Sequence, residues 1–340
     1  MRVAILGTGL IGSSIGLRLR RDPSTDTEVV GFDRYTEVAR QAQRAGAIDT
    51  AAHTPEQAVE GADLVILAAP VLAIRKLLEE IAPVVSREAI ITDTGSTKTE
   101  VMRWAQELLP AHTGFVGGHP MAGKTETGPD AADPDLFEGA RWIVVPAVRT
   151  TEGATNGVLW LADRMGATTI FMDAAEHDAY AAAVSHMPMV AATALFSMEH
   201  ASEAWPELSE LAAGGFKDMT RLAGTDAAMA YDIIVTNREQ TIHWLDRYLV
   251  ALREMRDQLA DPASEQDLFK LIAGNEFEYV AYRNGKVGRE EKNKSPDMSG
   301  YTIQDFLMGG WAKDKIDEIA RSSEERVREN AQSNRDRRDV

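Results

Sequence analysis

One histidine and one serine stand directly after predicted strands, where the side chains of a parallel sheet can do chemistry. His119 lies in the segment GGHPMAG (residues 117–123), and Ser96 lies in DTGSTK (residues 93–98). A histidine, whose ordinary pKa is about 6.5, can accept a proton near neutral pH, and a serine hydroxyl can orient a reacting hydroxyl group. We therefore predict that His119 is a general base and Ser96 its partner. Ser96 could also cap a helix that starts at Thr97, and the two roles are compatible.

Two more polar clusters, SHMP (residues 185–188) and GGFKDMTR (residues 214–221), lie in the second half of the chain. Arg221 has the planar fork that binds a carboxylate through two hydrogen bonds, so we predict that it holds a substrate carboxylate; a surface arginine is the alternative. Ser185 and His186 are predicted to line the substrate pocket, although His186 could equally be a hydrogen-bonded core residue. We expect Lys98, Lys124 and Lys217 to be solvated supporting cations, and His53, His112, His177, His200 and His243 to be structural.

A dinucleotide site is predicted where Gly7, Gly9 and Gly12 form G-x-G-x-x-G between a strand and a helix. These glycines permit a tight turn, the approach of a pyrophosphate and close packing of helix on strand. Asp33 follows Gly12 by 21 residues, where a carboxylate binds the ribose hydroxyls of NAD and repels the 2′-phosphate of NADP. Arg34 could accommodate that phosphate, so NADP stays an alternative to NAD. The residues expected at the cofactor are Gly7, Thr8, Gly9, Leu10, Ile11, Gly12, Asp33, Arg34, Ala69 and Pro70.

Short apolar runs alternate with amphipathic stretches through the first half of the chain. The predicted strands are residues 3–6, 29–32, 64–68, 89–92, 114–116, 142–145 and 168–171, and the predicted helices are 11–20, 36–45, 72–84 and 97–108. Residues 123–139 are predicted to be a long loop near the site. This alternation predicts an α/β Rossmann-type domain with a doubly wound parallel sheet over residues 1–172.

Helical patterns dominate after residue 173, at 174–198, 205–213, 229–260 and 264–280. They predict an all-α domain over residues 173–283 that contributes to the substrate site and to a homodimer. Residues 181–198 are apolar on nearly all sides of the predicted helix. This pattern favours a buried helix over a membrane span, and we expect it to be buried at a subunit interface. Residues 284–340 are predicted to be a polar extension with one short helix at 303–320 and a frayed end from 322.

The composition excludes several classes of function. The formal net charge is −17, from 53 acidic and 36 basic side chains, so nucleic acid and anionic membranes are poor partners. The chain has no cysteine, which removes disulfides, thiolate metal sites and cysteine nucleophiles. We predict no metal. Because the sequence opens in an apolar strand without a cationic leader, we expect a cytoplasmic protein.

The ordered motifs GTGLIG, DTGSTK, GGHPMAG, SHMP and GGFKDMTR, together with DLFEG at residues 135–139, resemble the prephenate/arogenate dehydrogenase family over roughly residues 3–237. The resemblance implies NAD-dependent oxidative decarboxylation of prephenate or L-arogenate, giving 4-hydroxyphenylpyruvate or L-tyrosine in tyrosine biosynthesis. His119 would then take the proton of the C4 hydroxyl, and Arg221 would bind the ring carboxylate.

The chain departs from the family pattern at two positions. Ala230 stands where the family has a tryptophan, and Met189 stands where Ser-His-x-Pro-His ends in histidine. Met189 cannot donate a hydrogen bond to a keto-acid side chain, so we predict a preference for arogenate and a loss of tyrosine inhibition. The alternatives are another NAD(P)-dependent hydroxyacid dehydrogenase and a non-catalytic NAD-binding sensor. The first is disfavoured because Lys217 is followed four residues later by Arg221 rather than by asparagine.

Overall fold

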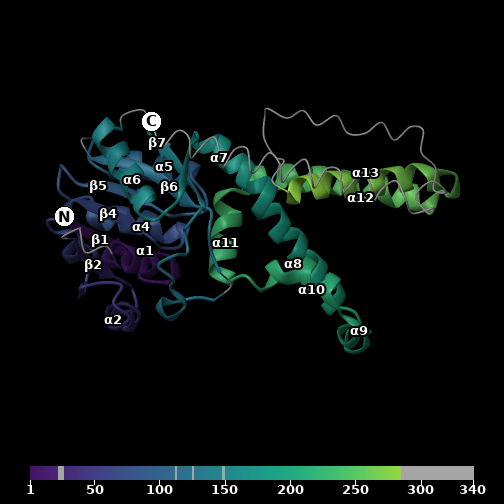
Figure 1. Cartoon of the computed structure of the whole chain (residues 1–340), viewed down its shortest axis with the longest axis horizontal. Coiled ribbons are helices and arrows are strands. Elements are labelled where there is room, and N and C mark those ends of the chain that lie inside the picture. The colour runs from purple at the N-terminus through teal and green to yellow at the C-terminus, as the bar shows by residue number, and fades with distance from the viewer. Residues whose placement is uncertain (22–26, 112, 125, 148–149, 285–340) are drawn as a thin grey trace, which may run out of the picture. The chain divides into compact units, whose positions relative to one another are not determined.

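A computed structural model describes residues 1–21, 27–111, 113–124, 126–147 and 150–284 of the 340-residue chain (Figure 1). These residues fall into two compact units, Met1–Asp246 and a second unit that begins at Arg247. All the predicted site residues belong to the first unit. The predicted domain boundaries at 172/173 and 283/284 stay predictions, and the predicted helix at 303–320, the frayed end and His112 lie outside the described residues.

An eight-stranded sheet with the order β3-β2-β1-β4-β5-β6-β7-β8 forms the first half of the chain. Its strands are β1 (Arg2–Leu6), β2 (Glu28–Phe32), β3 (Thr50–Ala51), β4 (Leu64–Leu67), β5 (Ile90–Asp93), β6 (Gly114–Pro120), β7 (Arg141–Pro146) and β8 (Thr168–Phe171). All neighbours are parallel except β6 and β7. The prediction of a Rossmann-type domain with a doubly wound parallel sheet is therefore confirmed, apart from the antiparallel pair of β6 and β7. A parallel pair needs a crossover, usually a helix, whereas an antiparallel pair can be joined by a loop.

Each face of the sheet has its own apolar core, because side chains alternate along the strands. Ala4 and Leu6 of β1 face one core, and Val3 and Ile5 face the other. The first core also contains residues of α3 (Pro55–Val59), α4 (Val71–Ile81) and α5 (Thr99–Leu108). The second contains residues of α1 (Leu10–Arg21), α2 (Thr36–Arg44) and α6 (Glu152–Arg164). The sheet is thus covered on both faces, which leaves the carboxyl ends of its strands to form a site.

The helical half begins with α7 (Ala174–Ala181), continues through one π-helical turn (Ala182–His186) and runs on as α8 (Met187–His200). Pro188 has no N–H to donate to the preceding turn, which accounts for the widened helix at this point. The remaining helices are α9 (Trp205–Leu211), α10 (Gly214–Thr220), α11 (Ala227–Thr236), α12 (Arg238–Ala260) and α13 (Glu265–Arg283), with 3₁₀ turns at Arg221–Gly224 and Pro262–Ser264. The predicted single helix at 229–260 is divided at Asn237. The polar cluster at 214–221, which falls between the predicted helices, is mostly helix α10.

The apolar stretch Ala174–His200 is the one helical segment among the described residues that is long and apolar enough to cross a membrane, judged by length and composition alone. Only 28% of its most apolar window is buried within the chain. Val184 is 71% exposed and Met198 is 62% exposed. The stretch is therefore not a core helix of this single chain, and its burial at a subunit interface stays a prediction.

Helix α1 approaches the turn after α2 so closely that only glycine fits at Gly16, where a Cβ would overlap the backbone oxygen of Ala47. We expect Gly16→Ala to lower stability by about 1–3 kcal/mol, the usual cost of overpacking. Gly153 in α6 is the matched control, since its Cβ would meet nothing within 4 Å. Gly153→Ala should be neutral or stabilising by up to ~1 kcal/mol. Urea unfolding curves of both variants measure the difference, and equal midpoints would contradict the predicted packing.

Candidate active site

Four neighbouring strands bring the predicted motifs to one edge of the sheet. The glycine loop follows β1, Ala69 and Pro70 follow β4, Ser96 follows β5, and His119 is the second-last residue of β6. Because these strands are parallel and adjacent, their carboxyl ends lie side by side. The structure therefore places both predicted catalytic residues at the same edge as the predicted cofactor residues.

The glycine loop fits a dinucleotide. Gly7 has a φ of 103°, and a Cβ there would overlap the backbone oxygen of Ala68, while a Cβ on Gly12 would overlap the oxygen of Gly7. At Gly9, by contrast, a Cβ would meet nothing within 4 Å, so the backbone is open to a pyrophosphate there. Asp33 accepts hydrogen bonds from the backbone N–H groups of Thr8 (3.0 Å) and Tyr35 (3.0 Å), which fixes its carboxylate beside the loop.

Arg34 lies with its guanidinium 4.6 Å from the centroid of the Tyr35 ring. Arg34 follows Asp33 in the chain, so this stacking holds its guanidinium at the place predicted for the adenosine ribose. Leu10 and Ile11 open helix α1, whose N-terminus presents its free N–H groups to an anion. Every residue predicted at the cofactor thus lies in, or directly beside, the glycine loop and the turns after β2 and β4.

His119 is the first member of a chain of hydrogen bonds. Its Nδ1 lies 2.8 Å from Nε2 of His177, and Nδ1 of His177 lies 2.8 Å from Oδ1 of Asp178. A carboxylate only accepts hydrogen bonds, so neutral His177 carries its proton on Nδ1 and offers the lone pair of Nε2. His119 must then donate from its own Nδ1. The lone pair of His119 Nε2 is left to accept a proton, as a general base requires.

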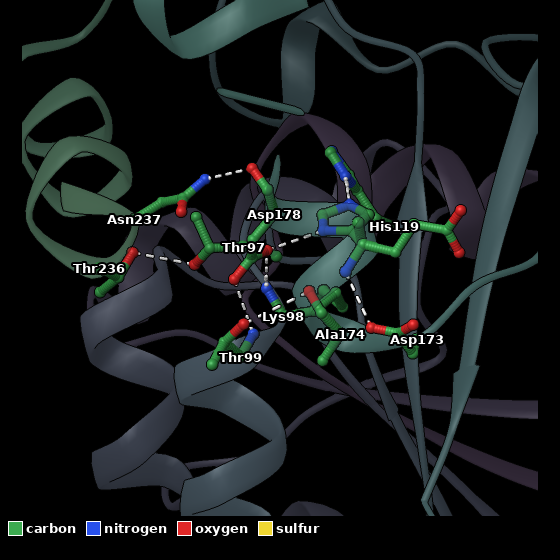
Figure 2. Close-up of polar contacts among 12 residues, drawn as sticks. Thr97, Lys98, Thr99, His119, Asp173, Ala174, Asp178, Thr236 and Asn237 are labelled. Carbon is green, nitrogen blue, oxygen red and sulfur yellow. Dashed lines mark hydrogen bonds and ion pairs between the residues drawn. The ribbon is translucent and has the colours of Figure 1, made fainter. Parts of the chain in front are cut away.

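Asp178, at the end of this chain, is fixed by the N-terminus of α5. Its Oδ1 accepts a hydrogen bond from the backbone N–H of Lys98 (2.7 Å), and its Oδ2 accepts one from that of Thr99 (2.8 Å), as Figure 2 shows. Burial alone would raise the pKa of Asp178, but the hydrogen bonds from His177, Thr99 and Lys98 lower it below its ordinary value. The carboxylate is therefore ionised and can stabilise positive charge on the two histidines.

Lys98 is fully buried and forms an ion pair with buried Asp93. Our prediction that Lys98 is solvated is wrong. The carboxylate of Asp93 also accepts backbone hydrogen bonds from Gly95 (2.8 Å) and Gly118 (3.1 Å), so the pair joins the loop after β5 to β6, one residue before His119. A lysine can stay in such a site because the adjacent carboxylate compensates its charge.

The environment of His119 keeps its imidazole neutral. Burial, followed by the nearby charges of His177, Lys98 and His186, holds the pKa of His119 well below its ordinary value of 6.5. A base with a lowered pKa is fully deprotonated at neutral pH. It is therefore ready to accept a proton over the whole physiological range.

His186 and Met189 are buried, at 1% and 6% exposure, whereas Ser185 is exposed. The amide nitrogen of Asn237 lies 3.1 Å from Nδ1 of His186 and donates to the backbone oxygen of Asp178 at 2.7 Å. His186 is thus buried and hydrogen-bonded, as expected of a core residue, and Asn237 connects it to Asp178, where the hydrogen-bond chain from His119 ends. The two interpretations of His186 are compatible.

The side chains of Ser96 and Arg221 have no hydrogen-bonding or ionic partner among the described residues of the chain. Helix α5 begins at Thr99 with Lys98 at its N-cap, so the prediction that Ser96 could cap a helix from Thr97 is wrong. The exposed guanidinium of Arg221 follows α10 and is free to bind an anion. Lys217 is also exposed, and Lys124 forms an ion pair with Asp133 at 2.8 Å.

The sequence analysis missed the roles of His177, Asp178 and Asn237. His177 was predicted to be merely structural, whereas it contacts His119. One signal was available: a His-Asp pair directly follows the last strand of the sheet, at the start of the first helix. No comparable signal marks Asn237, apart from its being an amide within an apolar helical pattern.

Two protein-family models match this chain. Residues 15–171 match the model described as the nucleotide-binding domain of prephenate dehydrogenase, and residues 173–273 match its dimerization domain. The prephenate dehydrogenase of Bacillus subtilis (strain 168) is 36% identical over 295 residues, which cover 85% of this chain and 77% of the relative.

Solved structures give the same likeness. Prephenate dehydrogenase from A. aeolicus, in complex with hydroxyphenyl propionate and NAD+, has a TM-score of 0.77 and 28% identity, over 83% of this chain and 98% of that one. Synechocystis arogenate dehydrogenase has a TM-score of 0.69 and 25% identity, over 84% of this chain and 100% of that one. Both similar structures therefore extend over the sheet and the helices that follow it.

The buried pair of Lys98 and Asp93 gives a test of stability. Lys98→Met leaves the Asp93 carboxylate buried without a counter-charge, and we expect a loss of about 3–5 kcal/mol in the free energy of unfolding. The double variant Lys98→Met/Asp93→Asn removes both charges and should recover part of that loss. Chemical denaturation of the two variants and the parent protein measures this. A double variant as unstable as the single one, or more so, would show that the charges are not coupled.

Proposed function

Because this chain belongs to the prephenate dehydrogenase family and is an NAD-dependent dehydrogenase, we propose that it oxidatively decarboxylates L-arogenate or prephenate, with arogenate preferred. The observation that carries this proposal is the hydrogen-bond chain from His119 through His177 to Asp178, which ends in a free lone pair at the cofactor edge of the sheet. Oxidising a ring alcohol needs such a base beside a hydride acceptor.

The residues of the glycine loop and Asp33 would hold NAD, which accepts a hydride when it is bound. His119 accepts the proton of the C4 hydroxyl on Nε2 as the C4 hydride leaves and the C1–carboxylate bond breaks to release CO₂. The electron pair of that bond makes the ring aromatic. His119 returns its proton to the ring oxygen, so the products are a phenol, CO₂ and the reduced cofactor, without net release of a proton.

While the proton is on His119, the imidazolium donates from Nδ1 to His177, and His177 donates to ionised Asp178. This arrangement stabilises the positive charge without moving a second proton. The free hydroxyl of Ser96 would hydrogen-bond the same C4 hydroxyl and direct it towards His119. The free guanidinium of Arg221 would bind the ring carboxylate through two hydrogen bonds until it leaves as CO₂.

We assign substrate preference to the part of the helix that carries Ser185, His186 and Met189. A buried methionine offers no hydrogen-bond donor to the keto acid of prephenate. Arogenate carries an ammonium group instead of the keto oxygen and does not need that donor. In the family pattern the histidine that Met189 replaces is also implied to contact the inhibitor tyrosine, so we propose that tyrosine does not inhibit this enzyme.

Membership of a dehydrogenase family removes the NAD-binding sensor as an alternative.

We further propose that the chain works in the cytoplasm as a homodimer through its helical half. Exposed apolar side chains support this, including Val184, Met198 and Tyr231, and so does the match of residues 173–273 to a dimerization domain. Light scattering on the purified protein reports its mass, and a monomer at working concentration would contradict the dimer.

Replacing the proposed base tests the mechanism. We expect His119→Asn to lower kcat by on the order of 10²–10⁴, because it removes the proton acceptor, while NAD binding, measured by calorimetry, is retained. His53→Asn is the matched control, since His53 is exposed and follows the edge strand β3, which is separated from β6 by four strands. Because the pKa of His119 is lowered, the base form persists down to acid pH, and kcat/KM of the parent enzyme should stay level from pH 8 to 6.5. An acidic limb at pH 7 or above would contradict this assignment.

Substrate preference is tested by following NADH formation at 340 nm with arogenate and with prephenate, each with and without tyrosine. We expect a higher kcat/KM on arogenate and no inhibition by tyrosine. Met189→His should shift the ratio towards prephenate by roughly tenfold, the value of one hydrogen bond, and should introduce inhibition by tyrosine. Met189→Leu is the control that keeps the size and apolar character of the side chain. A parent enzyme that prefers prephenate would refute the role given to Met189 but not the family.

A further inference from the structure

Asn237 is a buried amide at the break between α11 and α12. It is 5% exposed and follows an apolar run that includes Ile233. A buried amide must find hydrogen-bond partners or lose a substantial free energy of hydration. Asn237 finds them outside its own helix, at Asp178 and His186, as Figure 2 shows for Asp178.

The contacts of Asn237 determine which way its amide faces. The backbone oxygen of Asp178, 2.7 Å away, can only accept, so the atom that faces it must be the amide nitrogen. The same nitrogen lies 3.1 Å from Nδ1 of His186 and has a second hydrogen to give. Nδ1 of His186 must therefore be the unprotonated nitrogen of the ring, and the proton is on Nε2.

The surroundings of His186 also keep it neutral. Burial lowers the pKa of His186 to about 4, an effect that Asp178 opposes and His177 adds to. A neutral imidazole has one proton, and the amide of Asn237 leaves it only one place. At neutral and mildly basic pH the ring therefore presents an N–H group on Nε2.

This tautomer is the opposite of the one at His119. The Nδ1 of His119 faces an acceptor, Nε2 of His177, so His119 presents a lone pair on Nε2. The Nδ1 of His186 faces a donor, the amide of Asn237, so His186 presents an N–H group. Both rings are connected to adjacent residues of α7, His119 directly to His177, and His186 through Asn237 to Asp178. One can accept a proton and the other can donate a hydrogen bond.

We propose that Asn237 is a positioning residue that holds His186 as its Nε2–H tautomer, so that His186 donates a hydrogen bond to an oxygen of the substrate. The inference rests on the proposed function, because it assumes that a substrate with carboxylate and hydroxyl oxygens binds beside His119. Asn237 itself does not touch the substrate. It acts through the ring that it orients.

Two further hydrogen bonds hold helix α11 in place. One turn and a half before Asn237, the carboxylate of Asp232 accepts a hydrogen bond from the backbone N–H of Leu72 (3.0 Å), at the N-terminus of α4. The hydroxyl of Thr236 is hydrogen-bonded to that of Thr97 at 2.9 Å. These contacts fix α11 to the turns after β4 and β5. The amide of Asn237 therefore has a defined position relative to the strand ends.

The test is to observe the protons on His186 directly. The full-length protein is labelled with ¹⁵N-histidine, and long-range ¹H–¹⁵N spectra at pH 7.5 report which ring nitrogen carries hydrogen. The signal of His186 is the one lost in His186→Gln. We expect a protonated Nε2 and an unprotonated Nδ1 in the parent protein. Protonation of Nδ1 there would overturn the proposal.

Two variants change the partner of Nδ1. In Asn237→Asp a carboxylate replaces the donor, so Nδ1 of His186 should become protonated. In Asn237→Leu the donor is lost and the side-chain size is nearly kept, so the tautomer should no longer be fixed. We expect kcat/KM to fall by roughly tenfold or more in each variant, mainly through KM, since the lost hydrogen bond is to the substrate.

Thr241→Val is the matched control. Thr241 is as buried as Asn237, and its hydroxyl donates only to the backbone oxygen of Asn237 within the same helical segment. This control should keep both the His186 spectrum and KM. If one Asn237 variant fails to fold, the other still provides the measurement. A folded variant with an unchanged KM would overturn the proposal.

The proposed function can fail separately. A parent protein without activity on arogenate and prephenate would refute that function, whatever the spectrum shows. Activity together with a protonated Nδ1 on His186 would refute the role of Asn237 alone. The spectrum needs no substrate, so the two results are independent.

Discussion

The carboxylate of Asp178 is the interaction on which the arrangement of the site depends. It accepts hydrogen bonds from the first two backbone N–H groups of α5, at Lys98 and Thr99, and from His177. The backbone oxygen of the same residue holds the amide of Asn237. A buried carboxylate is costly unless it is paired, and here the positive end of a helix and an imidazole compensate it. Because α5 follows the loop after β5, this one residue fixes α7, the first helix of the helical half, to the loop that carries Ser96.

The same residue gives the two histidines of the site their different chemistry. Through its side chain, Asp178 sets the tautomer of His177 and thereby leaves a lone pair on His119. Through its backbone, it sets the direction of the Asn237 amide and thereby the proton on His186. Two identical side chains close together would otherwise have no fixed assignment as base and donor. Their roles follow from the hydrogen-bonding character of the group at each Nδ1, and neither role requires an unusual intrinsic property of the ring.

How much of this could be predicted depends on whether the physical cause is local. The glycine loop, the strands before Asp33 and Ser96 and the position of His119 follow from short patterns, because turn geometry and strand alternation are set within a few residues. The roles of His177, Asp178 and Asn237 come from contacts between residues 58, 80 and 59 positions apart, which a single sequence does not reveal. Lys98 was predicted to be solvated. Its ion-pair partner, Asp93, comes close to it only when the loop after β5 is folded, so the sequence alone does not reveal the ion pair. The antiparallel β7 was missed for a similar reason, since the run of apolar residues does not encode strand direction.

The acidity of the chain bears on which substrate its site accepts. Prephenate carries two negative charges, whereas the ammonium group of arogenate reduces its net charge to one. A protein with a formal net charge of −17 opposes the first more than the second. At physiological ionic strength, however, charges further away than about 8 Å are largely screened, so the groups within the pocket must decide. In the proposed mechanism Arg221 binds the ring carboxylate that both substrates share, so it would not discriminate between them. The choice would therefore fall to the residues near the substrate side chain. Buried Met189 supplies no donor for a keto oxygen there, and this is the basis of the proposed preference for arogenate.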